Sequence, residues 1–179
     1  MKPINRYLSN KIQPFSIKAT DENIRQIVQD ELDRLGHDAD LNHIDVSRVT
    51  NMNSVFCCSN IDLGPKYADL NPDISNWNVR NVKNMTAMFY ECKNFNQDLS
   101  QWDVNNVTHR QETFCRCENF NQDISGWNVR NVINMRYMFS ECKNFNQDLS
   151  RWNVNKVIYN DYMFDDCPIK EEYKPHFVN

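Results

Sequence analysis

The sequence predicts an α/β repeat solenoid with a capping helix at its N-terminal end. Two observations lead to this prediction: a motif recurs at a period of 25 residues without a gap, and a segment with helical spacing precedes the repeats. A fixed period of about 20 to 50 residues is typical of proteins that stack similar structural units. The chain has 179 residues, which fits one such stack and excludes two large domains.

Residues 1–40 are expected to contain the cap. Apolar residues lie at helical spacing from Ile24 to Leu35, acidic Asp21 and Glu22 suit the first turn of a helix, and Gly36 suits its end. The end of a stack otherwise leaves strand edges and apolar side chains uncovered. We therefore expect this helix to pack on the half-repeat from Leu41 to Phe56, with a partner-binding amphipathic helix as the alternative.

Residues 41–69 are expected to form an atypical half-repeat, which carries part of the motif between Ile44 and Phe56 and is followed by an irregular insertion. Four full repeats follow, namely repeat 1 (70–94), repeat 2 (95–119), repeat 3 (120–144) and repeat 4 (145–169). Pro168 ends the pattern, and residues 170–179 are expected to form a short polar tail or cap.

The spacing of apolar residues explains why the repeats must stack. Within each repeat, alternating apolar positions are followed by the spacing of one helical turn, so a single repeat cannot bury its apolar face alone. Parallel stacking places equivalent side chains about 4.8 Å apart, in columns along the axis. The expected core columns are Ile74, Leu99, Ile124 and Leu149; Val79, Val104, Val129 and Val154; Val82, Val107, Val132 and Val157; and Phe89, Phe114, Phe139 and Phe164.

The block FNQDLSQWDV and the MFxxC-like element that follows it resemble the BspA-type leucine-rich repeat, over residues 41–169. This resemblance implies a right-handed, leucine-rich-repeat-like stack, in which each coil contains two short strands and one helical turn. It also implies a bacterial repeat protein that takes part in adhesion or protein interaction.

Composition and charge exclude several functional classes. The chain has 20 basic and 24 acidic residues without a long basic cluster, which argues against nucleic-acid binding. No apolar run suits a signal peptide or a membrane span, and seven cysteines without an export signal suggest reduced thiols. We expect a cytoplasmic protein of bacterial or phage origin, without a cofactor, that is a monomer or a weak oligomer; surface exposure is implied only by the family resemblance.

Asparagine is over-used, with 27 residues against 3 glycines, which suggests that asparagine occupies positions where ordinary turns take glycine. A column of aspartates is expected at the bends of the repeats. Unit charges about 5 Å apart repel by roughly 1 kcal/mol in water, so each carboxylate needs donors from nearby serine, asparagine or backbone N–H groups. Turn formation is the favoured role and divalent cation binding the alternative for Asp73, Asp98, Asp123 and Asp148.

Two further columns allow both a structural and a functional interpretation. Tryptophans lie two residues before a core valine, which favours the interior over an exposed strip that stacks on sugars or peptides. Cysteines at the end of each repeat lie in a line, which favours buried thiols over four ligands around one zinc ion. The two columns are Trp77, Trp102, Trp127 and Trp152, and Cys92, Cys117, Cys142 and Cys167.

Repeat 2 departs most from the motif, because Arg110 stands where repeats 1 and 3 have Met85 and Met135. A buried, unpaired arginine costs several kcal/mol, so we expect this turn to shift outward or Arg110 to pair with Glu112 or another acid. Repeat 4 varies at the same place. Sequence drift without function is one explanation, and a partner-binding patch is the other; the candidate patch comprises His109, Arg110, Gln111, Glu112, Tyr159 and Asp161.

The function expected from the sequence is a non-enzymatic protein–protein interaction module, with inhibitor, immunity factor and adhesion-type binder as the roles considered. No catalytic residues are assigned, because the four dispersed histidines form no motif with a nucleophile. The acidic balance favours a partner with a basic patch. The alternative is a glycan-binding surface module that uses the tryptophan column.

Overall fold

The structure is a computed structural model that describes residues 16–59 and 64–178. Residues 1–15 of the expected N-terminal segment and residues 60–63 of the expected insertion therefore lie outside the described residues. In chain order the elements are β1 (Ile17–Lys18), α1 (Ile24–Leu35), β2 (Ile44–Asp45), and the 3-10 helices η1 (Pro65–Tyr67) and η2 (Glu171–Tyr173). The rest of the described chain consists of turns, bends, isolated bridges and irregular segments.

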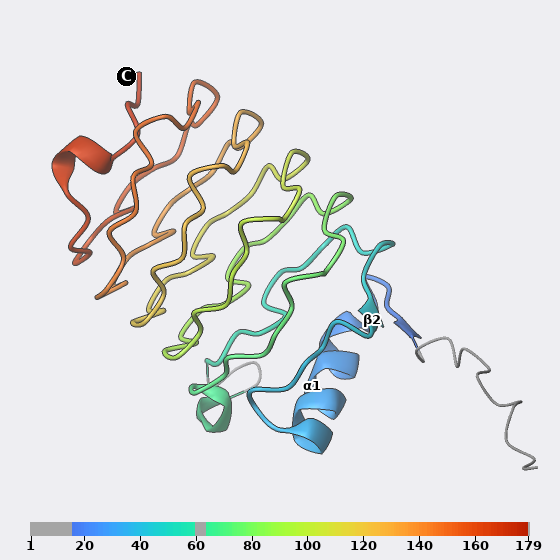
Figure 1. Cartoon of the computed structure of the whole chain (residues 1–179). Helices are drawn as coiled ribbons and strands as arrows, with labels where there is room; N and C mark the ends of the chain where they lie inside the picture. Colours follow the sequence, from blue (N-terminus) through green and yellow to red (C-terminus); the bar gives the residue numbers. More distant parts are fainter. Residues whose placement is uncertain (1–15, 60–63, 179) are drawn as a thin grey trace, which may run out of the picture.

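Successive repeats lie side by side in sequence order, from the half-repeat beside α1 to repeat 4 beside η2 (Figure 1). Neighbouring repeats are joined by parallel bridges of single residues, which run from Asn51 through Asn84, His109 and Asn134 to Tyr159. β1 pairs in parallel with β2 in the half-repeat. The architecture is therefore a repeat structure with little regular secondary structure.

The expected α/β content is wrong for repeats 1 to 4, whose described residues contain neither α-helix nor continuous strand. The reason is that the chain turns too often for either element. Turn bonds such as Met88 N–H to Met85 O, at 3.2 Å, alternate with residues of positive φ such as Ala87 at 51° and Glu91 at 64°. A strand needs several consecutive extended residues, so the pairing is reduced to isolated bridges.

Backbone N–H groups of alternate residues donate to the following repeat, and all of these bonds point toward the C-terminal end. In repeat 3, the N–H groups of Met135, Tyr137, Phe139 and Glu141 donate to the carbonyls of Tyr159, Asp161, Met163 and Asp165, respectively, at 2.7, 3.1, 2.9 and 2.8 Å. Equivalent bonds join repeat 1 to repeat 2 and repeat 2 to repeat 3. This directional ladder fixes the register between repeats.

The interior consists of the columns that the sequence predicts. The isoleucine–leucine column is fully buried, as are Val82, Val107 and Val132, whereas Val157 and Phe164 in repeat 4 are only partly buried. Phenylalanine rings of successive repeats stack with centroids 5.4 to 5.8 Å apart and interplanar angles of 2° to 9°, through Phe56, Phe89, Phe114, Phe139 and Phe164. One continuous core therefore runs through all the repeats.

Helix α1 lies at the N-terminal end of the stack, and its residues Ile24, Val28 and Leu32 belong to the same core (Figure 1). The expectation for its first turn is wrong, because Asp21 precedes the helix and accepts hydrogen bonds from the N–H groups of Thr50 and Asn51 at 2.6 and 2.9 Å. The aspartate thereby ties the helix to the half-repeat. No helix within the described residues is long and apolar enough to cross a membrane.

Asparagine connects repeats and does not take the place of glycine. None of the described residues with positive φ is an asparagine. Instead, asparagine side chains bond to the neighbouring repeat: the Oδ1 atoms of Asn71, Asn96 and Asn121 accept from the backbone N–H one repeat later, at 2.9, 2.9 and 3.0 Å. Residues of several other types adopt the left-handed turns, so the expected substitution of glycine by asparagine is wrong.

Candidate functional site

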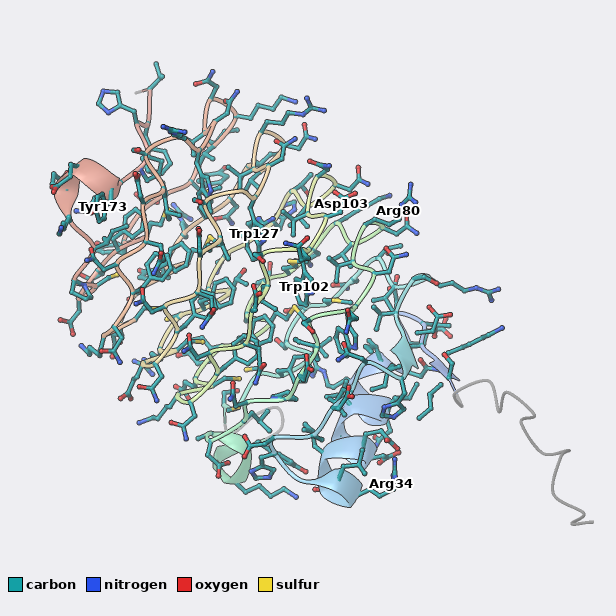
Figure 2. The ribbon with its side chains drawn as sticks, viewed as in Figure 1. Arg34, Arg80, Trp102, Asp103, Trp127 and Tyr173 are labelled. Carbon is teal, nitrogen blue, oxygen red and sulfur yellow. The ribbon has the colours of Figure 1, made fainter. Side chains whose placement is uncertain are left out.

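The tryptophan column lies in the interior, with side chains that are only 3 to 5% exposed. Each indole Nε1–H donates to a backbone carbonyl of the preceding repeat or half-repeat: Trp77 to Leu41, Trp102 to Ile74, Trp127 to Leu99 and Trp152 to Ile124, at 3.0 to 3.3 Å. Trp102 and Trp127 lie in the middle of the stack, whereas Arg80 and Asp103 lie at its margin (Figure 2). These indoles therefore offer no stacking platform to a sugar.

The aspartate column forms turns. In every repeat the carboxylate accepts the backbone N–H of the serine two residues later, at 2.8 to 3.0 Å, as in Asp73–Ser75, Asp98–Ser100, Asp123–Ser125 and Asp148–Ser150. Hydrogen bonds from the serine backbone and side chain lower the pKa of Asp73, Asp123 and Asp148. Among the described residues, no group of His, Cys, Asp or Glu side chains is arranged to hold a metal ion.

The cysteine column is buried except at repeat 4, where Cys167 is partly exposed, and none of the described cysteines forms a disulfide. The thiols of Cys92, Cys117 and Cys142 each donate to a phenylalanine carbonyl of the preceding repeat or half-repeat at 2.9 Å. Burial raises the pKa of these three thiols. A thiol that keeps its proton is a poor nucleophile, so this column has a structural role.

Arg110 contradicts the expectation that it shifts outward or pairs with an acid. Its side chain is fully buried, and none of its Nε, Nη1 and Nη2 atoms has a hydrogen-bond partner among the described residues. The ladder explains this position, because the backbone N–H of Arg110 donates to Asn134 O at 2.9 Å in the same register as the methionines of repeats 1 and 3. Arg110 is therefore not available to a partner at the surface.

Many residues that differ between repeats lie in one part of each repeat, which we call the variable face; other positions, such as Asn76, Gln101, Gly126 and Arg151, also differ but lie outside it. It is formed by the part of each repeat that carries the ladder. The variable face comprises Asn84, Thr86, Ala87, Tyr90 and Glu91; His109, Gln111, Glu112, Cys115 and Arg116; Asn134, Arg136, Tyr137, Ser140 and Glu141; and Tyr159, Asp161, Tyr162, Asp165 and Asp166.

A row of charges crosses the variable face at its centre. Arg116 lies between Glu91 and Glu141, with Nη1 and Nε at 2.7 and 3.0 Å from their respective Oε1 atoms. Its Nη1 also donates to the hydroxyl of Tyr90 at 3.2 Å. Hydrogen bonds to the two glutamates raise the pKa of Arg116. A shallow pocket of about 250 Å³ lies beside this row, lined by Tyr90, Glu112, Cys115, Arg116, Tyr137, Ser140, Glu141 and Asp165.

Aromatic side chains occupy the variable face toward repeat 4. The rings of Tyr137 and Tyr162 stack with centroids 5.0 Å apart. Arg136 lies over the ring of Tyr159, with Cζ 4.7 Å from the centroid, and its Nε is 2.6 Å from Asp161 Oδ2. Tyr159 and Tyr162 remain 43% and 60% exposed. This part of the face combines stacked aromatic surface with polar groups.

The sequence matches the family described as "Mycoplasma protein of unknown function, DUF285" over residues 22–108 and again over residues 62–174. The chain belongs to the DUF285 family. The two overlapping matches span α1 and all four repeats of this bacterial DUF285 protein. No protein with a curated description and no solved structure matches this DUF285 protein.

Five of the six recognition residues proposed from the sequence lie on the variable face of the DUF285 protein. Repeat 3 connects them across neighbouring repeats, because Asn134 pairs with both His109 and Tyr159 through backbone bridges and Arg136 pairs with Asp161. Sequence reasoning missed Arg116, Tyr137 and Tyr162. Comparing repeats 1 and 3 could have found Tyr137, since Ala87 is its equivalent.

Proposed function

We propose that this DUF285 protein is a non-enzymatic module that binds another protein through its variable face. The observation that supports this function is the separation of residues by role. Residues that recur in every repeat fill the core or form turns, whereas the variable face differs between repeats and is formed mostly by exposed or partly exposed residues. A preorganised surface binds with a small loss of conformational entropy, and repeat proteins often use such extended surfaces for binding.

The proposal also includes a specific type of repeat architecture. We infer a right-handed, leucine-rich-repeat-like solenoid of the BspA type, which would present its variable face as one continuous surface. The parallel bridges and the stacked phenylalanine column support a stack of this kind. An inhibitor, an immunity factor and an adhesion-type binder would all use such a surface in the same way.

The chemistry of the variable face favours a partner with a basic patch. Acidic side chains outnumber basic ones on it: Glu91, Glu112, Glu141, Asp161, Asp165 and Asp166 against Arg116 and Arg136. Both arginines are already engaged by carboxylates within the face. Tyrosine is enriched at protein interfaces, and Tyr90 and Tyr137 line the central pocket.

Capture from a Mycoplasma lysate with matched variants tests this function. The face variant carries Glu112→Ala and Tyr137→Ala, which truncate two partly exposed side chains of the variable face. The control variant carries Arg80→Ala and Arg130→Ala, two exposed residues that are not part of the variable face; Figure 2 labels Arg80 at the margin of the stack. We expect the wild type and the control to retain the same partner, while the face variant loses it at an unchanged melting temperature. Loss of the partner by the control but not by the face variant would place binding elsewhere.

A further inference from the structure

The end of the stack formed by repeat 4 has a row of backbone donors without acceptors. In repeats 1 to 3, the N–H groups of four alternate residues donate to carbonyls of the following repeat. The equivalent residues of repeat 4 are Asn160, Tyr162, Phe164 and Asp166, and their N–H groups have no hydrogen-bond partner within residues 16–59 and 64–178. We call residues 158–166 the repeat 4 edge. The register of the preceding ladder already orients this edge for one more pairing segment.

Side chains at the repeat 4 edge are uncovered as well. Ile158, Tyr159 and Tyr162 are three of the five large apolar side chains that are exposed in the described part of the chain, at 70%, 43% and 60%. Phe164 is the last ring of the phenylalanine column; it stacks on Phe139, and Lys174 Nζ of the tail lies 5.9 Å from its centroid. An open ladder and exposed apolar side chains thus coincide, which is typical of a surface that pairs with another chain.

The C-terminal tail covers a different part of this end. The N–H of Leu149 donates to Tyr173 O at 2.8 Å, and the N–H of Lys170 donates to Asn146 Oδ1 at 3.0 Å. The tail therefore continues the ladder beside the first half of repeat 4. It leaves the donors of the repeat 4 edge unpaired.

The direction of the ladder argues against a second copy of this chain as the occupant. Two repeat 4 edges cannot satisfy the four donors by pairing with each other, because these N–H groups would face N–H groups; the edge offers in register the carbonyl of Ile158, whose equivalent Ile133 O accepts from Ile158 N–H at 2.9 Å. The complementary carbonyls lie in the half-repeat at the opposite end, where Arg25 Nη2 already donates to Asn53 O at 3.0 Å. Asp21 binds Thr50 and Asn51 beside it. Helix α1 therefore occupies the place that a second copy would need.

Charge indicates what kind of segment fits the repeat 4 edge. Asp161, Asp165 and Asp166 lie on it; the tail adds Glu171 and Glu172 as well as Lys170 and Lys174, and Lys174 pairs with Glu171. Asp161 pairs with Arg136 and Asp166 pairs with Lys143, whereas Asp165 is exposed and has no ion pair within the described part of the chain. A segment with lysine or arginine side chains complements this edge.

We propose that the repeat 4 edge binds an extended basic segment of a partner protein, whose backbone carbonyls accept hydrogen bonds from Asn160, Tyr162, Phe164 and Asp166. Such pairing adds a strand-like segment to an exposed edge, in which backbone bonds contribute affinity and side chains contribute specificity. The proposal rests on the proposed function as an interaction module, but it assigns backbone contacts: the variable-face variant Glu112→Ala/Tyr137→Ala removes the ring that stacks on Tyr162 and none of the four edge N–H groups.

A synthetic peptide tests this proposal directly. The probe is an acetylated and amidated octapeptide of alternating lysine and valine, and the matched probe replaces lysine with glutamate. Amide exchange and ¹H–¹⁵N spectra of the whole chain report on the edge. We expect the lysine peptide to slow exchange at the four edge amides at least tenfold, with no effect of the glutamate peptide. Absence of protection, or equal protection by both peptides, would overturn the proposal.

One pair of variants and one single variant separate backbone pairing from other binding. Asn160→Pro removes one edge N–H, whereas Asn160→Ala keeps it; we expect a tenfold loss of peptide affinity for the first and less than a twofold change for the second. Equal affinity of these two variants would contradict backbone pairing.

Asp165→Lys tests charge without altering the backbone, and unchanged affinity for the lysine peptide would exclude a basic occupant. If sedimentation shows that the chain alone self-associates and Asn160→Pro abolishes this, the occupant is a second copy and the proposal is wrong.

Discussion

The guanidinium of Arg110 lies over the indole of Trp127, with Cζ 4.6 Å from the ring centroid. This is its one polar interaction among the described residues, because its three nitrogens have no hydrogen-bond partner there. A cation–π contact contributes about 2 kcal/mol when desolvated. An unpaired buried charge costs more than that, so burial lowers the pKa of Arg110 to about 9. Arg110 is therefore an unfavourable residue in an otherwise apolar column.

Replacement of Arg110 by methionine is expected to stabilise the protein, since Met85 and Met135 occupy the equivalent positions and are fully buried. We expect Arg110→Met to raise the free energy of unfolding by about 2 kcal/mol or more, measured by urea denaturation at pH 7. The reciprocal change Met135→Arg should lower it. A destabilised Arg110→Met variant would mean that the arginine makes a favourable interaction in solution.

The gain in the free energy of unfolding that Arg110→Met provides should become smaller in alkaline solution. The folded protein has an Arg110 pKa of about 9, below the ordinary value of 12.5. Between these values the unfolded chain binds the proton that the folded chain has lost, so the wild type gains stability relative to the variant as pH rises. Urea unfolding of both proteins at pH 7.5 and pH 10 measures this change; a constant difference would show that Arg110 stays charged.

The carboxylate of Glu31 in α1 is expected to make the free energy of unfolding decrease at acidic pH. Glu31 accepts hydrogen bonds from Arg34, at 2.5 Å, and lies 2.8 Å from His43 Nε2. The Arg34 hydrogen bond and then His43 lower the Glu31 pKa below its ordinary value of 4.5. This stabilisation is present above pH 4.5 and is lost as the pH falls through the folded pKa. The stability difference between wild type and Glu31→Gln should therefore narrow from pH 6 to pH 3 in thermal unfolding.

The buried tryptophans should contribute hydrogen bonds as well as apolar surface. Trp102→Phe removes the bond from Nε1 to Ile74 O, which is 3.2 Å long, and leaves a buried carbonyl with one partner fewer. We expect a loss of about 1 to 3 kcal/mol from the lost bond and the smaller ring, measured by urea unfolding. Acrylamide should quench the wild-type indoles weakly; strong quenching would mean that the column is exposed.

The periodicity of the sequence was sufficient to predict the core. Val82, Val107 and Val132 are buried because one backbone register repeats through the stack, and an equal spacing in sequence becomes an equal position in space. The same reasoning placed the tryptophans inside and the aspartates at bends. Such columns are predictable because each one depends on local contacts between neighbouring repeats.

The features that the sequence did not predict depend on contacts between repeats, which the residues of a single repeat do not determine. Arg110 was expected to shift outward or to pair with an acid because its charge opposes burial, yet the ladder shared with repeats 1 and 3 holds its backbone in register. The turns at Ala87 and Glu91 have positive φ without glycine or asparagine, so residue preferences gave no signal for them. Strand content was overestimated for the same reason, and the variable face was found only in part because Arg116 and Tyr137 gain their neighbours from adjacent repeats.

Residues 91–100 and 141–150 are identical in sequence and belong to successive pairs of repeats. Because each repeat contacts its immediate neighbours through the same ladder, inserting another pair would create no new type of junction. The number of pairs therefore sets the separation between α1 and the repeat 4 edge without altering either. The length of the phenylalanine column would grow by two rings with each inserted pair.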